Sequence, residues 1–159
     1  MRVGVASDHV GFGVKTAVIE ALEHDNHAVL DLGTHGADPT DYAPMARAVV
    51  AAISKNFVDG GIVLCASGLG AAIVANRIPG IRAAAACDPA TARESREQID
   101  ANVLTVAAGN VAPDAVLAVV KSWMSAEFSR TDQAVVALKL IEESAAAAIP
   151  RQPAPVSAA

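Results

Sequence analysis

A cysteine follows an apolar run and precedes a turn of small residues. The stretch is Val63-Leu64-Cys65-Ala66-Ser67-Gly68-Leu69-Gly70, and an alanine-rich helical pattern comes after it. Free N–H groups at the start of a helix stabilise a nearby thiolate, so we expect the pKa of Cys65 to lie below ~8.5, the value of a free thiol. A thiolate beside unhindered N–H donors suits removal of a proton next to a carbonyl group and stabilisation of the oxyanion that results.

Each cysteine also has a structural interpretation, because most lone cysteines are small buried hydrophobes. Position alone leaves catalysis and packing open for Cys65. Cys87 has no glycine turn behind it, and we expect it to be a core residue.

Asp8 and His9 form a second polar pair, at the end of the first apolar run. Asp8 could instead cap the helix that begins near Phe12. Ligands of open parallel sheets bind outside the carboxyl ends of the strands, near the point where the strand order reverses. If the runs before Asp8 and before the Cys65 turn are strands of one such sheet, the two polar groups meet at one end of it. That end is the predicted site.

The elements that must position these residues alternate along the chain. The predicted strands are residues 3–6, 28–32, 61–65, 81–86 and 103–107. The predicted helices between and after them are residues 12–24, 42–55, 70–77, 89–98 and 113–125. Strands joined by crossover helices predict an α/β fold, with a doubly wound, five-stranded parallel sheet in a Rossmann-like, three-layer sandwich.

A further helix, residues 132–148, follows the last helix that the sheet requires. Its apolar face, with Val135, Leu138 and Ile141, could pack on a second subunit or on its own domain. We expect residues 1–148 to form one domain. The segment 149–159, rich in proline and alanine, is predicted to be a disordered tail.

Composition excludes several classes of protein. Of the 159 residues 53% are hydrophobic but only 3% are aromatic, so the core must be aliphatic, as suits helices on a parallel sheet. A net charge of −5 without a basic stretch argues against nucleic acid. Two cysteines, no signal-peptide pattern and no apolar run of the ~20 residues that span a bilayer favour a cytoplasmic protein without a membrane partner.

The glycine pair of Gly68-Leu69-Gly70 also resembles part of a dinucleotide-binding loop, with Asp88 about 20 residues farther on. Two features argue against that site. The bulky Ile73 stands at the third glycine position, and the turn follows the third strand instead of the first. A Walker loop is excluded because no Gly-Lys-Ser/Thr follows.

Several motifs together resemble the type B ribose-5-phosphate isomerases and the related galactose-6-phosphate isomerases, from Val3 to about Ile141. The most specific motifs are residues 7–12, 40–42, 59–62, 65–70, 75–77, 79–83 and 102–104. The resemblance implies a flavodoxin-like fold and no metal or other cofactor. It also implies a homodimer or a dimer of dimers, with active sites at the subunit interface.

The resemblance implies aldose–ketose isomerisation of a sugar or sugar phosphate through an enediolate, with Cys65 as the base that moves a proton between C1 and C2. The hydroxyl of Ser67 assists at the ring or carbonyl end, and Asp8 contacts the sugar. The substrate-binding residues are then His9, Ala66, Gly68, Leu69, Gly70, Gln98 and Arg130. Among them, the turn residues bind the enediolate oxygens through their N–H groups.

One departure from the family lies after the fourth predicted helix. The family has a His-Asn pair there, and its histidine is thought to open the sugar ring, whereas this chain has Gln98-Ile99. A glutamine cannot exchange a proton near neutral pH. An open-chain substrate needs no ring-opening acid; a tetrose 4-phosphate cannot close the usual ring, and several keto-uronates are acyclic when isomerised.

A second departure concerns phosphate binding. Two of the three family arginines are absent, since Gly109 and Ala134 occupy their positions. Each lost charge-assisted bond is worth ~1.5–3 kcal/mol, which favours a substrate with less phosphate character, such as a carboxylated or non-phosphorylated sugar. The cationic residues that could still contact an anion are His9, Arg130, Arg93 and Arg96.

Three functions therefore remain open. The first is an isomerase with a substrate shifted toward a tetrose 4-phosphate or a keto-uronate. The second is a genuine ribose-5-phosphate/ribulose-5-phosphate isomerase. The third is a non-catalytic module that binds a sugar or nucleotide, against which the retained Cys65 argues, because binding needs no thiol.

Overall fold

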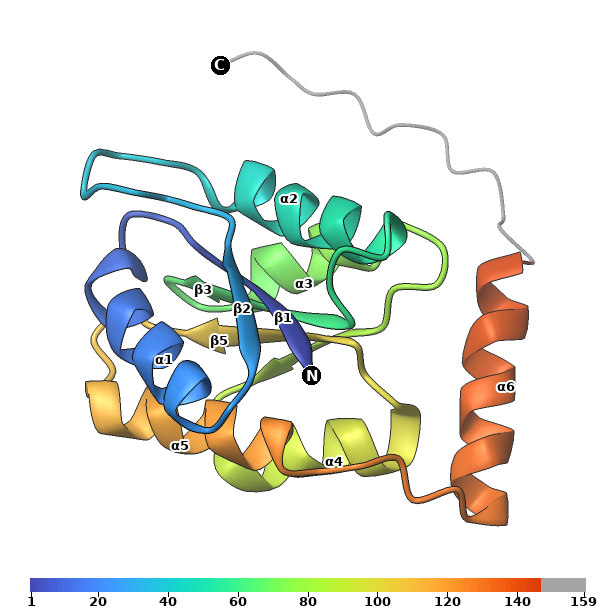
Figure 1. The fold of residues 1–159 in the computed structure, drawn as a ribbon. Coiled ribbons are helices and arrows are strands. Elements are labelled where there is room, and N and C mark those ends of the chain that lie inside the picture. Colours follow the sequence, from blue (N-terminus) through green and yellow to red (C-terminus); the bar gives the residue numbers. More distant parts are fainter. Residues whose placement is uncertain (147–159) are drawn as a thin grey trace.

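Five parallel strands form one sheet, and helices cover both of its faces (Figure 1). The strands are β1 (Arg2–Ser7), β2 (Ala28–Asp31), β3 (Gly60–Cys65), β4 (Ala83–Ala86) and β5 (Val103–Ala107). The helices are α1 (Phe12–His24), α2 (Tyr42–Ser54), α3 (Leu69–Ala75), α4 (Pro89–Ile99), α5 (Pro113–Met124) and α6 (Asp132–Ala146). This computed structural model describes residues 1–146, so the predicted tail, 149–159, lies outside the described residues. The predicted elements are confirmed, with boundaries that shift by at most two residues within that range.

The strand order is β2-β1-β3-β5-β4, and every neighbouring pair is parallel. The predicted doubly wound, flavodoxin-like α/β class is confirmed, and β2, β1 and β3 have the flavodoxin order. The last two strands are exchanged relative to that order, because β5 lies between β3 and β4. The strand order reverses at β1, because β2 lies on one side of β1 and β3 lies on the other. The carboxyl ends of β1 and β3 are therefore side by side.

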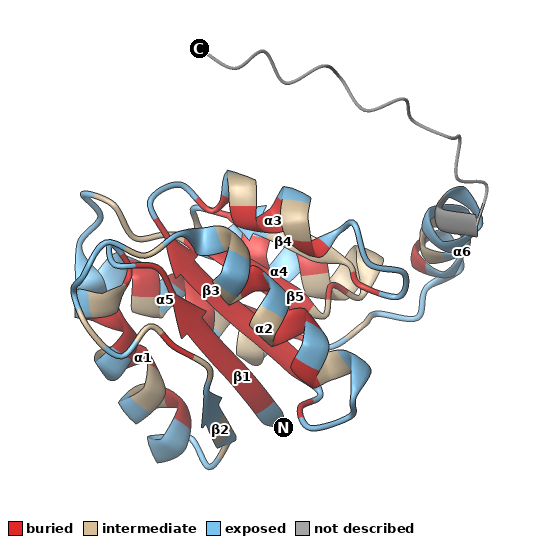
Figure 2. Ribbon diagram, turned by 90° about the horizontal axis from the view of Figure 1, so that it is seen from above, coloured by how far each residue is buried: buried red, intermediate tan, exposed pale blue. Residues whose placement is uncertain are grey.

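The sheet separates two apolar clusters. Helices α1, α4 and α5 pack on one face, and α2 and α3 pack on the other. Leu64 points into the first cluster with Trp123, whereas Val63 and Cys65 point into the second with Ala75 of α3. Figure 2 shows β1 and β3 as the most deeply buried strands. Cys65 therefore ends a fully buried strand on its α3 side.

Cys87 is exposed, so the prediction that it is a core residue is wrong. It follows β4, the strand at the end of the sheet order. Only one of the four alanines of β4 is buried, because no strand covers its outer side. The apolar run before Cys87 gave no sign of this position in the sheet.

Helix α6 packs against α4 and stands away from the sheet (Figure 1). Its apolar residues are largely uncovered: Val136 is 55% exposed and Leu140 is 58% exposed. With 15 residues it is the longest helix that the structure describes. Within residues 1–146, no helix combines the length and the apolar character needed to cross a bilayer.

A buried lysine on α1 ties the end of β2 to the end of β1. Lys15 is only 2% exposed, and its Nζ donates to both carboxylate oxygens of Asp31, at 2.6 and 2.8 Å, and to the Thr34 carbonyl, at 2.7 Å. The Thr34 N–H in turn donates to the Ser7 carbonyl at 2.8 Å. The loop after β2 is thereby fixed beside the residues that precede the Asp8-His9 pair.

We expect Lys15→Met to lower the free energy of unfolding by about 3 kcal/mol, because it leaves Asp31 and a backbone carbonyl without their common donor. Lys139→Met is the matched control, since it removes an exposed pair on α6, Lys139–Glu143 at 3.7 Å, of a kind that contributes little. Urea unfolding of both variants measures the difference. Equal, small losses in the two variants would contradict the structural role of Lys15.

Candidate active site

The predicted meeting of Asp8 with the Cys65 turn is confirmed. The N–H of Asp8 donates to the carbonyl of Leu64, the residue before Cys65, at 3.1 Å. Asp8 is 4% exposed, and its Oδ1 accepts from the N–H groups of Val10 and Gly11, both at 2.9 Å. Asp8 thus holds the turn that leads into α1, while Gly11 is the N-cap of that helix.

His9 is exposed at the same end of the sheet. Its Nδ1 lies 3.0 Å from the carbonyl oxygen and 3.2 Å from the nitrogen of Thr40. This contact fastens the end of the loop between β2 and α2 to the β1–α1 turn. The imidazole Nε2, on the far side of the ring from Thr40, is the atom left to contact a ligand.

Cys65 is 2% exposed and lies under the turn that follows it. The backbone N–H groups of Gly68, Ser67 and Ala71 lie close enough to the sulfur to stabilise its thiolate form. Gly68 has φ of +76°, a conformation that residues with a Cβ disfavour. The sequence of small residues therefore allows the chain to fold N–H donors over the thiol.

The prediction that the pKa of Cys65 is lowered is wrong. Burial raises the pKa of the Cys65 thiol, and the negative charge of Asp8 raises it further. The N–H groups of Gly68, Ser67 and Ala71 act in the opposite direction but do not compensate for burial. The thiolate is thus a stronger base than a free thiolate, and less of it is present at neutral pH.

We expect a reaction that depends on the Cys65 thiolate to accelerate as the pH rises through neutrality. A thiol is uncharged below its pKa, and burial raises that pKa, so each unit of pH below it removes about tenfold of the active form. A pH profile of kcat/KM measures the effect, because kcat/KM reports groups of the free enzyme. A profile that is already flat below neutral pH would contradict this assignment.

Tyr42 lies at the same site, although the sequence predicted no role for its side chain. A Cβ built on Gly70 would come within 2.5 Å of the Tyr42 ring, so the phenol lies directly over the cysteine turn. Tyr42 is the first residue of α2, and the Asp41 carboxylate caps that helix by accepting from the Ala43 N–H at 3.0 Å. The Asp-Tyr sequence before an apolar helical face was the available signal.

Gln98 and Arg130 lie at the opposite, amino end of the sheet. Helix α4 begins after β4 and ends before β5, so it carries Gln98 from the carboxyl end back to the amino end. The Ser129 N–H donates to the Glu97 carbonyl at 3.0 Å, which places Arg130 beside the same helix end. One chain therefore does not bring these two residues to Cys65.

Arg130 lines a cavity of about 240 Å³ at this amino end. The other lining residues are Arg96, Asp100, Glu127 and Phe128. The backbone of Arg130 is left-handed, with φ of +54°. Of the predicted anion contacts, Arg130 and Arg96 thus share one cavity, whereas His9 lies at the carboxyl end.

Comparisons with known proteins place this chain among sugar isomerases. The sequence model of a family described as Ribose/Galactose Isomerase matches residues 3–140. Ribose-5-phosphate isomerase B of Escherichia coli strain K12 is 35% identical over 144 residues, which cover 89% of this chain and 97% of the relative. A protein of Mycolicibacterium smegmatis named D-erythrulose-4-phosphate isomerase 2 is 33% identical over 131 residues, which cover 80% of this chain and 86% of the relative.

A solved structure is also similar to this chain over most of its length. Ribose-5-phosphate isomerase B of Clostridium thermocellum superimposes with a TM-score of 0.86 at 38% identity, covering 91% of this chain and 97% of that chain. The match to the family model includes the Cys65 turn, and each of these relatives covers at least 80% of this chain. This chain therefore belongs to the Ribose/Galactose Isomerase family of aldose–ketose isomerases.

Proposed function

We propose that this protein interconverts the aldose and ketose forms of an open-chain sugar phosphate, a tetrose 4-phosphate, with Cys65 as the base. The observation that carries the proposal is the buried Cys65 sulfur beneath the N–H groups of its own turn, beside the Asp8 carboxylate. A base and a set of oxyanion donors then lie at one point. Proton transfer next to a carbonyl group requires both.

The proposed reaction consists of two proton transfers. The Cys65 thiolate removes the proton from the carbon next to the carbonyl group, and the electron pair moves onto the carbonyl oxygen to give an enediolate. The N–H groups of residues 66–70 hold the enediolate oxygens, and the Ser67 hydroxyl assists proton movement between them. The Cys65 thiol then returns a proton to the neighbouring carbon. Asp8 contacts a substrate hydroxyl, and His9 contacts the phosphate.

The substrate class is inferred from the residue at the end of α4. Gln98 cannot act as the acid that opens a sugar ring, and a tetrose 4-phosphate has no usual ring to open. The relative from Mycolicibacterium smegmatis is named for D-erythrulose 4-phosphate, a sugar of this class. That likeness favours the tetrose over the keto-uronate that the sequence also left open.

We also infer that the functional unit is at least a homodimer. Gln98 and Arg130 can complete a site only if they come from a second copy, because their own chain holds them at the other end of the sheet. Leu69 and Ile73 of α3, 62% and 61% exposed, form an apolar surface beside the cysteine turn. A second copy that covers this surface would bring its own Gln98 and Arg130 to Cys65.

A panel of sugars in heavy water tests the function. Purified protein is incubated with a tetrose 4-phosphate, ribose 5-phosphate, a keto-uronate and a non-phosphorylated pentose, and deuterium at the carbon next to the carbonyl is measured. We expect the fastest labelling with the tetrose 4-phosphate. Labelling of ribose 5-phosphate at ordinary enzyme rates would overturn the shifted substrate. Absence of labelling by every sugar, with tight binding of a nucleotide, would favour the non-catalytic module.

A further inference from the structure

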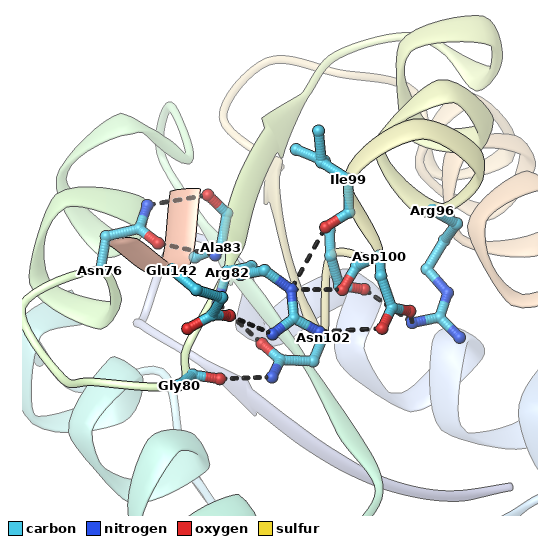
Figure 3. Close-up of polar contacts among 10 residues, drawn as sticks. Asn76, Gly80, Arg82, Ala83, Arg96, Ile99, Asp100, Asn102 and Glu142 are labelled. Atoms are coloured by element: carbon cyan, nitrogen blue, oxygen red, sulfur yellow. Dashed lines mark hydrogen bonds and ion pairs between the residues drawn. The ribbon is translucent and has the colours of Figure 1, made fainter. Parts of the chain in front are cut away.

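Arg82 is the centre of a polar network at the amino end of the sheet (Figure 3). It precedes β4, and its side chain is only 15% exposed. Its Nε donates to the carbonyls of Asp100, at 2.8 Å, and Ile99, at 3.2 Å, and its Nη2 donates to the Asp100 carboxylate at 2.9 Å. Three hydrogen bonds from one guanidinium thus end on the two residues that follow Gln98.

A second largely covered arginine contacts the same corner: the Arg96 side chain is 17% exposed. Arg96 donates through Nη1 to the Ala101 carbonyl at 2.8 Å and approaches the Asp100 carboxylate at 3.5 Å. Asp100 is the C-cap of α4, and its φ of +47° lies in the left-handed region in which many helices end. Two arginines therefore impose one conformation on the residues next to Gln98.

Arg82 also links this corner to α6. Its Nη1 donates to Glu142 of α6 at 3.0 Å, and its backbone N–H donates to the Asn102 side chain at 2.9 Å. The Asn102 amide donates in turn to the Gly80 carbonyl at 2.8 Å. Helix α6, which packs on α4, is thus also joined to the corner at the end of α4 through the Arg82 side chain, and the two form one surface that a second copy can contact.

We infer that Arg82 is a positioning residue that acts in trans: it fixes the Gln98-Ile99 corner of one subunit so that this corner completes the active site around Cys65 of the other subunit. The inference rests on the proposed function, in which Gln98 reaches the partner's site. Arg82 itself touches no substrate. Three of the four hydrogen bonds from its guanidinium hold the corner of its own subunit, and that corner acts in the site of the other subunit.

The first measurement compares Arg82→Met with Arg2→Met. Arg2 is a matched control at the same end of the sheet, since it also pairs with an aspartate, Asp59, and a backbone carbonyl, that of Asn56, but does not touch the corner. We expect kcat/KM to fall about 100-fold in Arg82→Met, as for a group displaced by about 1 Å, and to be unchanged in Arg2→Met. Arg82→Lys, which keeps the charge but cannot form the forked contacts, replaces Arg82→Met if that variant does not fold.

The second measurement separates action in trans from a general loss of structure. Cys65→Ala and Arg82→Met chains are co-expressed with different affinity tags, and the doubly tagged hetero-oligomer is isolated. One of its two kinds of site then has an intact Cys65 from one subunit and an intact corner from the other. We expect the hetero-oligomer to recover about half of the wild-type activity per dimer, although both parent homodimers are nearly inactive.

Two results would overturn the inference while the wild-type protein remains active: a hetero-oligomer as inactive as its parents, or an Arg82→Met homodimer as active as Arg2→Met. If the wild-type protein itself labels no sugar of the panel, the proposed function fails and the inference fails with it. The wild-type rate in the same assay therefore distinguishes the two failures.

Discussion

Cys65→Ala is expected to lower kcat/KM for the preferred sugar by about 1,000-fold, within the range that a positioned general base contributes. The variant keeps the N–H donors of the turn, so binding of the sugar should change far less than the rate. The decisive readout is deuterium labelling next to the carbonyl group, which requires a base and should disappear. Circular dichroism checks that the α/β fold is retained.

Cys87→Ala is the matched control, because it removes the other cysteine of the chain from an exposed position. We expect its activity to equal that of the wild-type protein. Retention of labelling by Cys65→Ala would remove Cys65 from the mechanism and leave it as a core residue of the α2–α3 side. A loss shared equally by the two variants would point to a general effect of thiol removal.

Gln98→His is expected to raise kcat/KM for ribose 5-phosphate by about 100-fold, because a positioned acid contributes at least that factor when a ring must open. Activity on the tetrose 4-phosphate should hardly change, since that substrate has no such ring. The two rates, measured in one assay, give a ratio that is independent of the amount of folded protein.

Gln98→Asn provides the comparison for this gain, since asparagine is polar but does not titrate. It should not gain activity on ribose 5-phosphate. A gain of equal size on both substrates would mean that position 98 acts on the proton transfer itself. No gain at all in Gln98→His would mean that the end of α4 does not reach the sugar ring.

The sequence was sufficient to predict the helices and strands and the part of the site where Asp8 meets the Cys65 turn. The boundaries of β5 and α1 are as predicted, because apolar runs and helical periodicity are local properties. The meeting of Asp8 with Cys65 followed from a general rule about parallel strands. The exposure of Cys87 could not be predicted in this way, because it depends on which strand lies at the edge of the sheet. No local sequence pattern specifies that β5 lies between β3 and β4.

The direction in which the pKa of Cys65 shifts shows a different limit of prediction from sequence. The turn correctly indicated N–H donors around the sulfur. Their effect is opposed by burial, and the depth of burial depends on α2 and β5, which are distant along the chain, as well as on the neighbouring α3. The place of Gln98, in contrast, was open to inference, because a crossover helix must return from the carboxyl to the amino end of a parallel sheet.

The buried, uncharged state of Cys65 also bears on the chemical durability of the enzyme. Peroxides attack the thiolate form of cysteine, and because burial raises the pKa of Cys65, little of that form is present at neutral pH before a substrate binds. Cys87, exposed after β4, is the cysteine on which oxidants act first, and sulfenic acid can form there without touching the base. The burial that keeps the Cys65 thiol uncharged thus also protects it from oxidation.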